Sequence, residues 1–260
     1  MKCSDVIDCL EEVSPKSFAE SWDNVGLLCG RQDREVKSVY IAVDATREVI
    51  EDAVAAGAEM LLTHHPMIFH PMKSLRGDDF IGSRLLDLAE NRICYYAMHT
   101  NFDVMGMGDA VADELNLQDR RVLSVTYEDD ISKEGIGRIG PLPTAMNLAE
   151  CAQYVKKSCA VEYVKVFGNP TDTVIMAAVC PGSGKSCVED AIRLGADVLI
   201  TGDIDHHTGL DAMAQGLSII DAGHYGLEKA FVPYMTEYLH RKLPQLTLFS
   251  APQQNPFWIL

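Results

Sequence analysis

The sequence lacks several features that would place the protein in a membrane, secreted or thiolate-zinc class. No apolar run approaches the ~20 residues that a membrane-spanning helix needs, so we expect no membrane insertion. The N-terminus has no apolar core of a signal peptide, which predicts a cytoplasmic protein. The eight cysteines include no Cys-x-x-Cys pair, so buried free thiols are expected rather than disulfides or a structural zinc site.

Basic residues are also scarce. The sequence contains 22 Lys and Arg residues and 38 Asp and Glu residues, which gives a formal net charge of −16. This balance argues against a broad basic surface, and therefore against extended nucleic-acid binding. Acidic residues attract divalent cations, although an acidic surface often serves only solubility. At 260 residues and 47% hydrophobic content, the chain can bury one large core or two modest ones.

Residues 61–66, Leu-Leu-Thr-His-His-Pro, are the most informative stretch. A short apolar strand ends there at His64 and His65, and a proline then halts the extended backbone. Adjacent side chains on an extended strand point in opposite directions. Either the backbone turns at this point, or the two imidazoles serve different metal ions.

Strands and helices alternate in the first part of the chain. The pattern predicts strands over 39–43, 60–63 and 93–98, and helices over 47–56 and 80–90. This alternation is typical of an α/β sheet with parallel crossover connections. Trp22, in a turn before the first of these strands, is expected to be a packing anchor rather than a ligand platform.

The chain then repeats itself. Residues 51–63 align without a gap with residues 189–201, and both copies read as helix, glycine, strand and polar segment. The second copy ends in Asp203, Asp205, His206 and His207, which can orient ligands or cap the next helix. We therefore expect duplicated α/β units, with residues 1–126 as the first repeat and 127–260 as the second. In open α/β sheets, ligands bind outside the carboxyl ends of the strands, where these polar residues lie.

Six of the eight histidines fall at these strand ends, and their concentration at matching points of a repeat favours metal binding. They are His64, His65, His99, His206, His207 and His224. Imidazole with carboxylate is a ligand set that suits zinc, iron, manganese or nickel. Two metals in one site need a bridging carboxylate. Glu228, four residues after His224, is well placed for this, and Asp103 can supply a second carboxylate.

The motifs that carry a family resemblance are distributed along most of the chain. They are Ser-Trp-Asp-Asn-Val-Gly-Leu at 21–27, Leu-Thr-His-His-Pro at 62–66, His-Thr-Asn-Phe-Asp at 99–103, Thr-Gly-Asp-Ile-Asp-His-His at 201–207 and Gly-His-Tyr-Gly-Leu-Glu at 223–228. In these motifs the sequence resembles the NIF-three-like family, whose members are often labelled GTP cyclohydrolase I type 2 homologues. The short centre resembles the form without an inserted middle domain.

The resemblance implies two intertwined α/β units with mixed sheets flanked by helices, a dinuclear centre of two divalent metal ions, and a homohexameric ring. The family pattern places the metal ligands at His64, His65, Asp103, His224 and Glu228, with Glu228 as the bridge. His99 is expected to contact substrate or to support the ligands.

The leading functional hypothesis is a dinuclear-metal-dependent hydrolase in which activated water attacks a small, nucleotide-like substrate, as in a GTP cyclohydrolase. His99 or Asp205 would then serve as general acid or base. The alternatives are a metal-binding or metal-delivery protein, or a hexameric scaffold, without turnover.

Residues 182–186, Gly-Ser-Gly-Lys-Ser, imitate the end of a P-loop. However, Val179 occupies the position of the first glycine, so an ATPase is not expected. The segment can hold a phosphate or be a simple turn between strand and helix.

Overall fold

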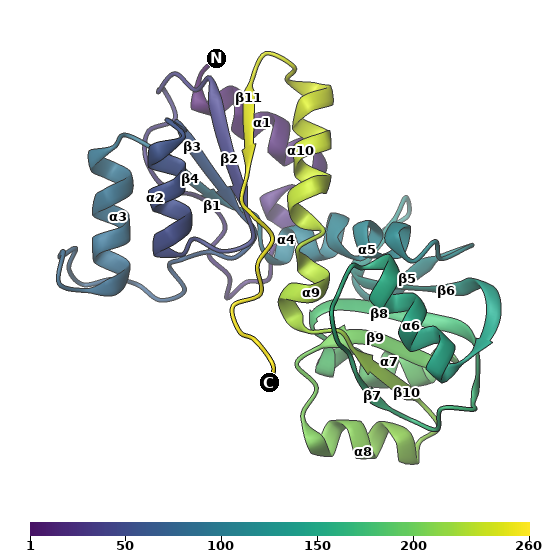
Figure 1. Cartoon of the computed structure of the whole chain (residues 1–260). Coiled ribbons are helices and arrows are strands. Elements are labelled where there is room, and N and C mark those ends of the chain that lie inside the picture. The colour runs from purple at the N-terminus through teal and green to yellow at the C-terminus, as the bar shows by residue number, and fades with distance from the viewer. The chain divides into compact units, whose positions relative to one another are not determined.

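The computed structural model describes all 260 residues, which form two compact units. Unit 1 comprises residues 1–102 and 231–253, and unit 2 comprises residues 103–230 and 254–260. Each unit contains one mixed sheet with helices packed against it, so the predicted α/β class is confirmed (Figure 1). None of the helices combines the length and the apolar composition that crossing a bilayer requires.

The sheet of unit 1 has the strand order β1-β4-β3-β2-β11. Its strands are β1 (Gly26–Cys29), β2 (Ser38–Ala42), β3 (Met60–Thr63), β4 (Cys94–Ala97) and β11 (Thr247–Ser250). Strands β4, β3, β2 and β11 are parallel, and β1 is antiparallel to β4. Every residue of β2, β3 and β4 is buried, as expected for strands covered on both faces.

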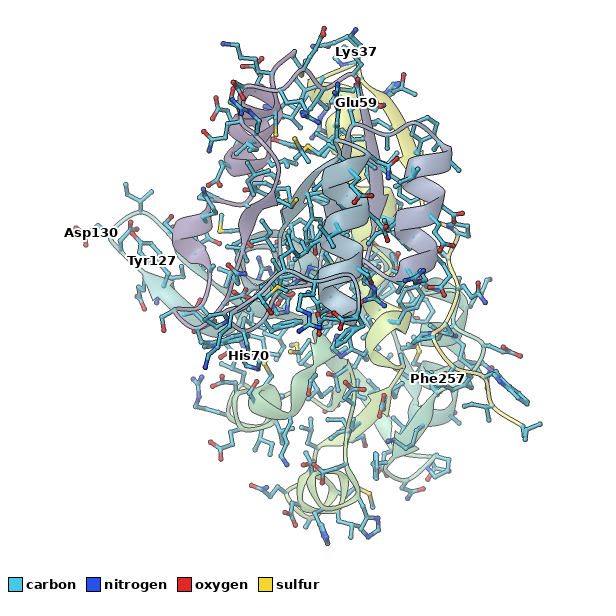
Figure 2. All side chains as sticks on the ribbon, turned by 90° about the vertical axis from the view of Figure 1, so that its left-hand side faces the viewer. Lys37, Glu59, His70, Tyr127, Asp130 and Phe257 are labelled. Atoms are coloured by element: carbon cyan, nitrogen blue, oxygen red, sulfur yellow. The ribbon has the colours of Figure 1, made fainter.

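Helices cover both faces of this sheet (Figure 1). They are α1 (Cys3–Val13), α2 (Arg47–Ala55), α3 (Phe80–Glu90) and α10 (Phe231–Lys242), with short helical segments η1 (Lys16–Phe18) and α4 (Thr100–Phe102). Thr46 begins α2 by accepting a hydrogen bond from the amide of Val49, and Asp79 caps α3 in the same way. Near the starts of β2 and β3, the Lys37 amide donates to the Glu59 carboxylate at 2.5 Å, and both residues are labelled in Figure 2.

Unit 2 has a six-stranded sheet in the order β5-β6-β8-β9-β10-β7. Its strands are β5 (Arg121–Glu128), β6 (Lys133–Asn147), β7 (Lys165–Phe167), β8 (Thr173–Ser183), β9 (Val198–Gly202) and β10 (Ser218–Asp221). Only β8, β9 and β10 are parallel to one another; the remaining pairs are antiparallel. Leu199 of β9 packs into a cluster with residues of α7 and α8, whereas its equally buried neighbours Val198 and Ile200 do not. Both faces of the strand are therefore covered.

The helical segments of unit 2 range from 4 to 11 residues. They are η2 (Asp103–Met107, a π-helical turn), α5 (Gly108–Glu114), α6 (Leu148–Ser158), η3 (Gly184–Cys187), α7 (Val188–Arg193), α8 (His206–Ala214) and α9 (His224–Glu228). Asn147 and Glu150 form a reciprocal capping box at the start of α6. All eight cysteines of the chain are free, and only Cys29 among them is not fully buried.

The sequence repeat corresponds to equivalent structure in the two units. In the first copy, α2 ends near Gly57 and leads into β3; in the second, α7 ends near Gly195 and leads into β9. Both glycines adopt left-handed conformations, with φ of 68° and 76°, which end a helix without strain on a side chain. β3 lies between two parallel neighbours in its sheet, and so does β9.

The compact units do not coincide with the two halves 1–126 and 127–260 expected from the repeat. Residues 103–126, including α5 and most of β5, belong to unit 2, because β5 pairs with β6. After residue 230 the chain returns to unit 1, where α10 packs on the sheet and β11 extends it. The duplication boundary at 126–127 stays a prediction about the repeat.

Candidate metal centre

His64 and His65 follow the carboxyl end of β3, where the backbone bends. Their amides donate to the carbonyls of Ala42 and Val43, which continues the pairing with the β2 segment beyond the strand. The two imidazole centroids are only 4.8 Å apart, with the ring planes at 48°. Of the two possibilities left by the sequence, the backbone therefore turns here, and both rings lie side by side.

His99 joins this pair from the end of the neighbouring strand. Thr63 of β3 pairs with Ala97 of β4, so the two strands end at the same level. The His99 ring centroid lies 5.4 Å from that of His64 and 5.5 Å from that of His65. Ligand nitrogens of the three histidines lie within 4.8 Å of one another. Unit 1 therefore contains a three-imidazole group that can hold a metal ion.

The Nδ1 nitrogens of His64 and His65 are each held by a hydrogen-bond acceptor. His64 Nδ1 donates to the carbonyl of Met98 at 2.8 Å, and His65 Nδ1 donates to the carboxylate of Asp44 at 2.8 Å. A nitrogen that donates to a carbonyl or carboxylate carries the proton, so Nε2 of the neutral ring keeps its lone pair. Nδ1 contacts of this kind fix the orientation of metal-ligating histidines.

Asp23 holds His99 in the same manner. Its side chain is fully shielded from solvent and accepts hydrogen bonds from His99 Nδ1 at 2.9 Å and from the Thr100 amide and hydroxyl at 3.0 and 2.5 Å. Burial raises the pKa of Asp23, but the hydrogen bonds from His99 and Thr100 outweigh it and lower the pKa to about 2. Asp23 is therefore an ionised, rigid anchor for the His99 ring at neutral pH.

Unit 2 contains a second group at the carboxyl end of β10. Gly223 has φ of 81°, a conformation that favours glycine, and it lets the chain turn from β10 into α9. His224 and Glu228, one helical turn apart on α9, face each other with Nε2 and Oε2 at 2.9 Å. His224 Nδ1 contacts the carboxylate of Asp203 at 2.8 Å, so this ring is also held from its outer side.

Glu228 and Asp103 bring two carboxylates together in unit 2. Glu228 is only 3% exposed, and a carboxylate oxygen of Asp103 lies within 4.8 Å of one of Glu228. Two carboxylates this close, one of them buried, are costly as anions unless a cation or proton compensates them. Ligands of one tetrahedral metal lie about 3.3 Å apart when the bonds are ~2.0 Å. The three histidines of unit 1 can therefore hold a divalent metal ion, and His224, Glu228 and Asp103 of unit 2 are donors of the types that such ions bind.

The glycine-rich segment 182–186 is the turn from β8 into η3 and packs against Glu228. A β-carbon added at Gly182, where φ is 73°, would lie 2.4 Å from Glu228 Oε1. One added at Gly184 would lie 2.0 Å from the hydroxyl of Thr201, at the end of β9. Lys185 forms an exposed ion pair with Asp205 at 2.9 Å. The two glycines thus permit the backbone to pass closely over Glu228 and Thr201.

The remaining polar residues predicted for the site lie around helix α8. Asp205 is its N-cap and accepts from the Thr208 amide at 3.0 Å. The Thr208 amide and the Lys185 ammonium lower the pKa of Asp205. His206 and His207 are exposed in the first turn, with ring centroids 5.3 Å apart. Among these three residues, Asp205 therefore has a clear local role as a helix cap.

Sequence reasoning missed Asp44 as a partner of His65 and Asp23 as the anchor of His99. Asp44 lies just beyond the carboxyl end of β2, so the rule that placed the histidines could have found it. Asp23 lies 76 residues before His99, and no local pattern links the two. The packing role expected for Trp22 was wrong, because its side chain is 64% exposed. His70 is not part of the group formed by His64, His65 and His99. It is exposed on the loop after β3 (Figure 2).

These features define a duplicated α/β protein in which unit 1 carries a group of three histidines and unit 2 carries His224, Glu228 and Asp103, all of them residue types that bind metal. The Duf34/NIF3 (NGG1p interacting factor 3) family profile matches residues 1–256. The chain belongs to this family.

Relatives that align over nearly their whole length with this chain support the assignment to the family. A protein of Clostridium perfringens named GTP cyclohydrolase 1 type 2 homolog is 32% identical over 261 residues, which cover 99% of each chain. The crystal structure of a Bacillus cereus protein related to NIF3 superposes with a TM-score of 0.91 at 25% identity, covering 100% of this chain and 99% of that one. Reduced HcgD from Methanocaldococcus jannaschii gives a TM-score of 0.82 at 31% identity, covering 96% and 97%. The predicted family, in its short form, is thereby confirmed.

Proposed function

We propose that the protein is a metal-dependent hydrolase that acts on a nucleotide-like substrate through two divalent metal ions. The proposed ligands are His64 and His65 from unit 1 and Asp103, His224 and Glu228 from unit 2, with Glu228 as the bridge. One observation carries the proposal: each of the three histidines has its Nδ1 held by a carboxylate or carbonyl acceptor. Such an arrangement keeps Nε2 oriented for a metal before any metal binds.

His99 is the proposed acid–base residue. Bound divalent ions supply Lewis acidity and activate water for attack on carbon or phosphorus. The Asp23 contact leaves His99 Nε2 free to accept a proton from water or to return it to a leaving group. Asp205 was the other candidate, but its carboxylate caps α8 and pairs with Lys185. A carboxylate with a lowered pKa is a weak base near neutral pH, so we assign the step to His99.

GTP is the substrate to test first, because several relatives are named GTP cyclohydrolase 1 type 2 homologs. We expect purified protein loaded with Zn, Fe, Mn or Ni to hydrolyse GTP, and the chelated protein to be inactive. Chromatographic separation of nucleotide products measures this, with generic phosphoesters tested in parallel. Metal transfer to an apo-protein without turnover of any substrate would instead identify metal delivery. Turnover by chelated protein would contradict the proposed role of the metals.

Gly182→Ala tests whether the turn over Glu228 supports metal binding. The added methyl group must displace the Glu228 carboxylate, since it would otherwise lie 2.4 Å from Oε1. We expect metal affinity to fall roughly 10- to 100-fold, the typical effect of disturbing the support of a ligand. Isothermal titration with Zn²⁺ or Mn²⁺ measures the change.

Gly195→Ala is the matched control for this variant. Gly195 has nearly the same conformation, with φ of 76°, but no atom lies within 4 Å of the added methyl group. Both variants should lose about 1 kcal/mol of stability from the left-handed conformation. Equal metal affinities for the two variants would show that Gly182 has no role beyond backbone conformation.

A homohexameric ring and a cytoplasmic location complete the proposal. The ring follows from the family resemblance, and light scattering on the metal-loaded protein tests it. The cytoplasmic location stays a prediction from the sequence.

A further inference from the structure

Two large aromatic side chains flank His99 in unit 1 and are unusually exposed. Trp22 is 64% exposed and Phe69 is 50% exposed. Their ring centroids lie 6.0 and 5.9 Å from that of His99, with interplanar angles of 78° and 85°. Neither ring is therefore stacked face to face on the imidazole, and each keeps much of its apolar surface in contact with water.

The backbone that carries these aromatic rings is fixed by hydrogen bonds. The Asn24 side chain donates to the carbonyl of Ile68 at 2.7 Å, which ties the Trp22 segment to the Phe69 segment. The Glu20 amide donates to the Thr100 hydroxyl at 2.9 Å, which ties the same segment to the start of α4. Asp23, next to Trp22, anchors His99 itself. The two aromatic residues are thus parts of a built site.

We propose that Trp22 and Phe69 form a platform that binds the planar heteroaromatic ring of the substrate beside His99. This inference rests on the proposed function, because it names the ligand chemistry of the same site. Exposed aromatic faces bind planar rings by stacking, which excludes water from both surfaces. The platform recognises the ring and not the phosphate. A nucleoside should therefore bind to it, just as a nucleotide should.

The sequence provides a direct signal for binding, since Trp22 and Trp258 are its two tryptophans. Trp258 is 77% exposed near the C-terminus, in unit 2, and Trp258→Phe leaves Trp22 as the single tryptophan. In metal-loaded Trp258→Phe protein, we expect guanosine and GTP to quench the Trp22 fluorescence with saturation. Inorganic triphosphate should produce no quenching. Absence of quenching by both guanosine and GTP at millimolar concentrations would overturn the platform.

Substitutions then separate aromatic stacking from general apolar contact. We expect Trp22→Leu and Phe69→Leu each to weaken guanosine binding about 5- to 150-fold by isothermal titration, the range found for single stacking partners. Trp22→Phe should recover much of the affinity. Phe80→Leu replaces another exposed phenylalanine of unit 1, 70% exposed on α3, and should bind as the wild type does. Equal losses for Phe69→Leu and Phe80→Leu would overturn the proposal.

The same variants distinguish this inference from the proposed hydrolase activity. Saturable guanosine binding that depends on Trp22, without turnover of GTP, would support the platform and contradict the hydrolase. Turnover of GTP with an unchanged KM in Trp22→Leu and Phe69→Leu would contradict the platform and leave the hydrolase intact. A change of oligomeric state in these variants by light scattering, with unaltered guanosine affinity, would assign the aromatic pair to a contact between copies and overturn the platform.

Discussion

Replacing Glu228 by alanine is expected to remove bound metal from the protein without unfolding it. We expect the content to fall from the two proposed ions per chain to one or none, because Glu228 is the proposed bridge between them. The apo-protein should stay folded, with only a small change in stability. Glu228 is only 3% exposed and lies close to Asp103, so its removal relieves repulsion between carboxylates and the cost of burying one of them. These gains offset the loss of its contact with His224 Nε2 at 2.9 Å.

Atomic emission on purified protein measures the metal content, and thermal unfolding with and without metal measures stability. At a metal concentration 100 times Kd, binding should stabilise the wild type by about 2.7 kcal/mol for each independent site. Glu228→Ala should show little of this gain. Glu228→Gln, which keeps the shape and removes the charge, should behave like the alanine variant.

Glu189→Ala is a suitable control, since Glu189 is an exposed acidic residue on α7 of the same unit. It should keep both ions and the full stabilisation. Two ions per chain in Glu228→Ala would contradict the bridging assignment. Loss of metal together with a strongly destabilised apo-protein would instead assign Glu228 to the fold.

Replacing His65 by alanine is expected to lower the turnover of GTP by roughly 100- to 1,000-fold. A metal acting as a Lewis acid contributes several kcal/mol to the transition state, and each 1.4 kcal/mol is a factor of ten. The variant loses a proposed ligand, and the Asp44 carboxylate loses its partner at 2.8 Å. The measurement is steady-state turnover of GTP at saturating metal, together with metal content by atomic emission.

His70→Ala provides the matched control. His70 lies in the same loop, five residues further on, and is exposed rather than part of the three-histidine group. It should retain wild-type turnover and metal content. Unchanged turnover in His65→Ala would assign the activity to a contaminant, and equal losses in both variants would indicate damage to the loop rather than to a ligand.

The local sequence determined much of the architecture. Helix α2 begins after Thr46 and ends just before Gly57, and the apolar residues after Gly57 form a buried strand. Helix capping, a glycine in the left-handed conformation and the hydrophobic pattern each act over only a few residues, so the local sequence is enough to predict these elements. The aligned repeat predicted the equivalent helix and strand around Gly195. The carboxyl-end rule placed His64, His65, His99 and His224 at strand ends, which is where they lie.

Only the tertiary structure decided which residues meet these histidines. The register of β3 against β4 brings His99 beside His64 and His65, and folding brings Asp23 to His99 across 76 residues of sequence. The return of α10 and β11 to unit 1 likewise has no local signature. Strand pairing and long-range hydrogen bonds depend on the whole chain having folded, because their partners are distant in sequence. Short-range pattern therefore specified the elements and the kind of site, and packing selected the acceptors that orient each imidazole.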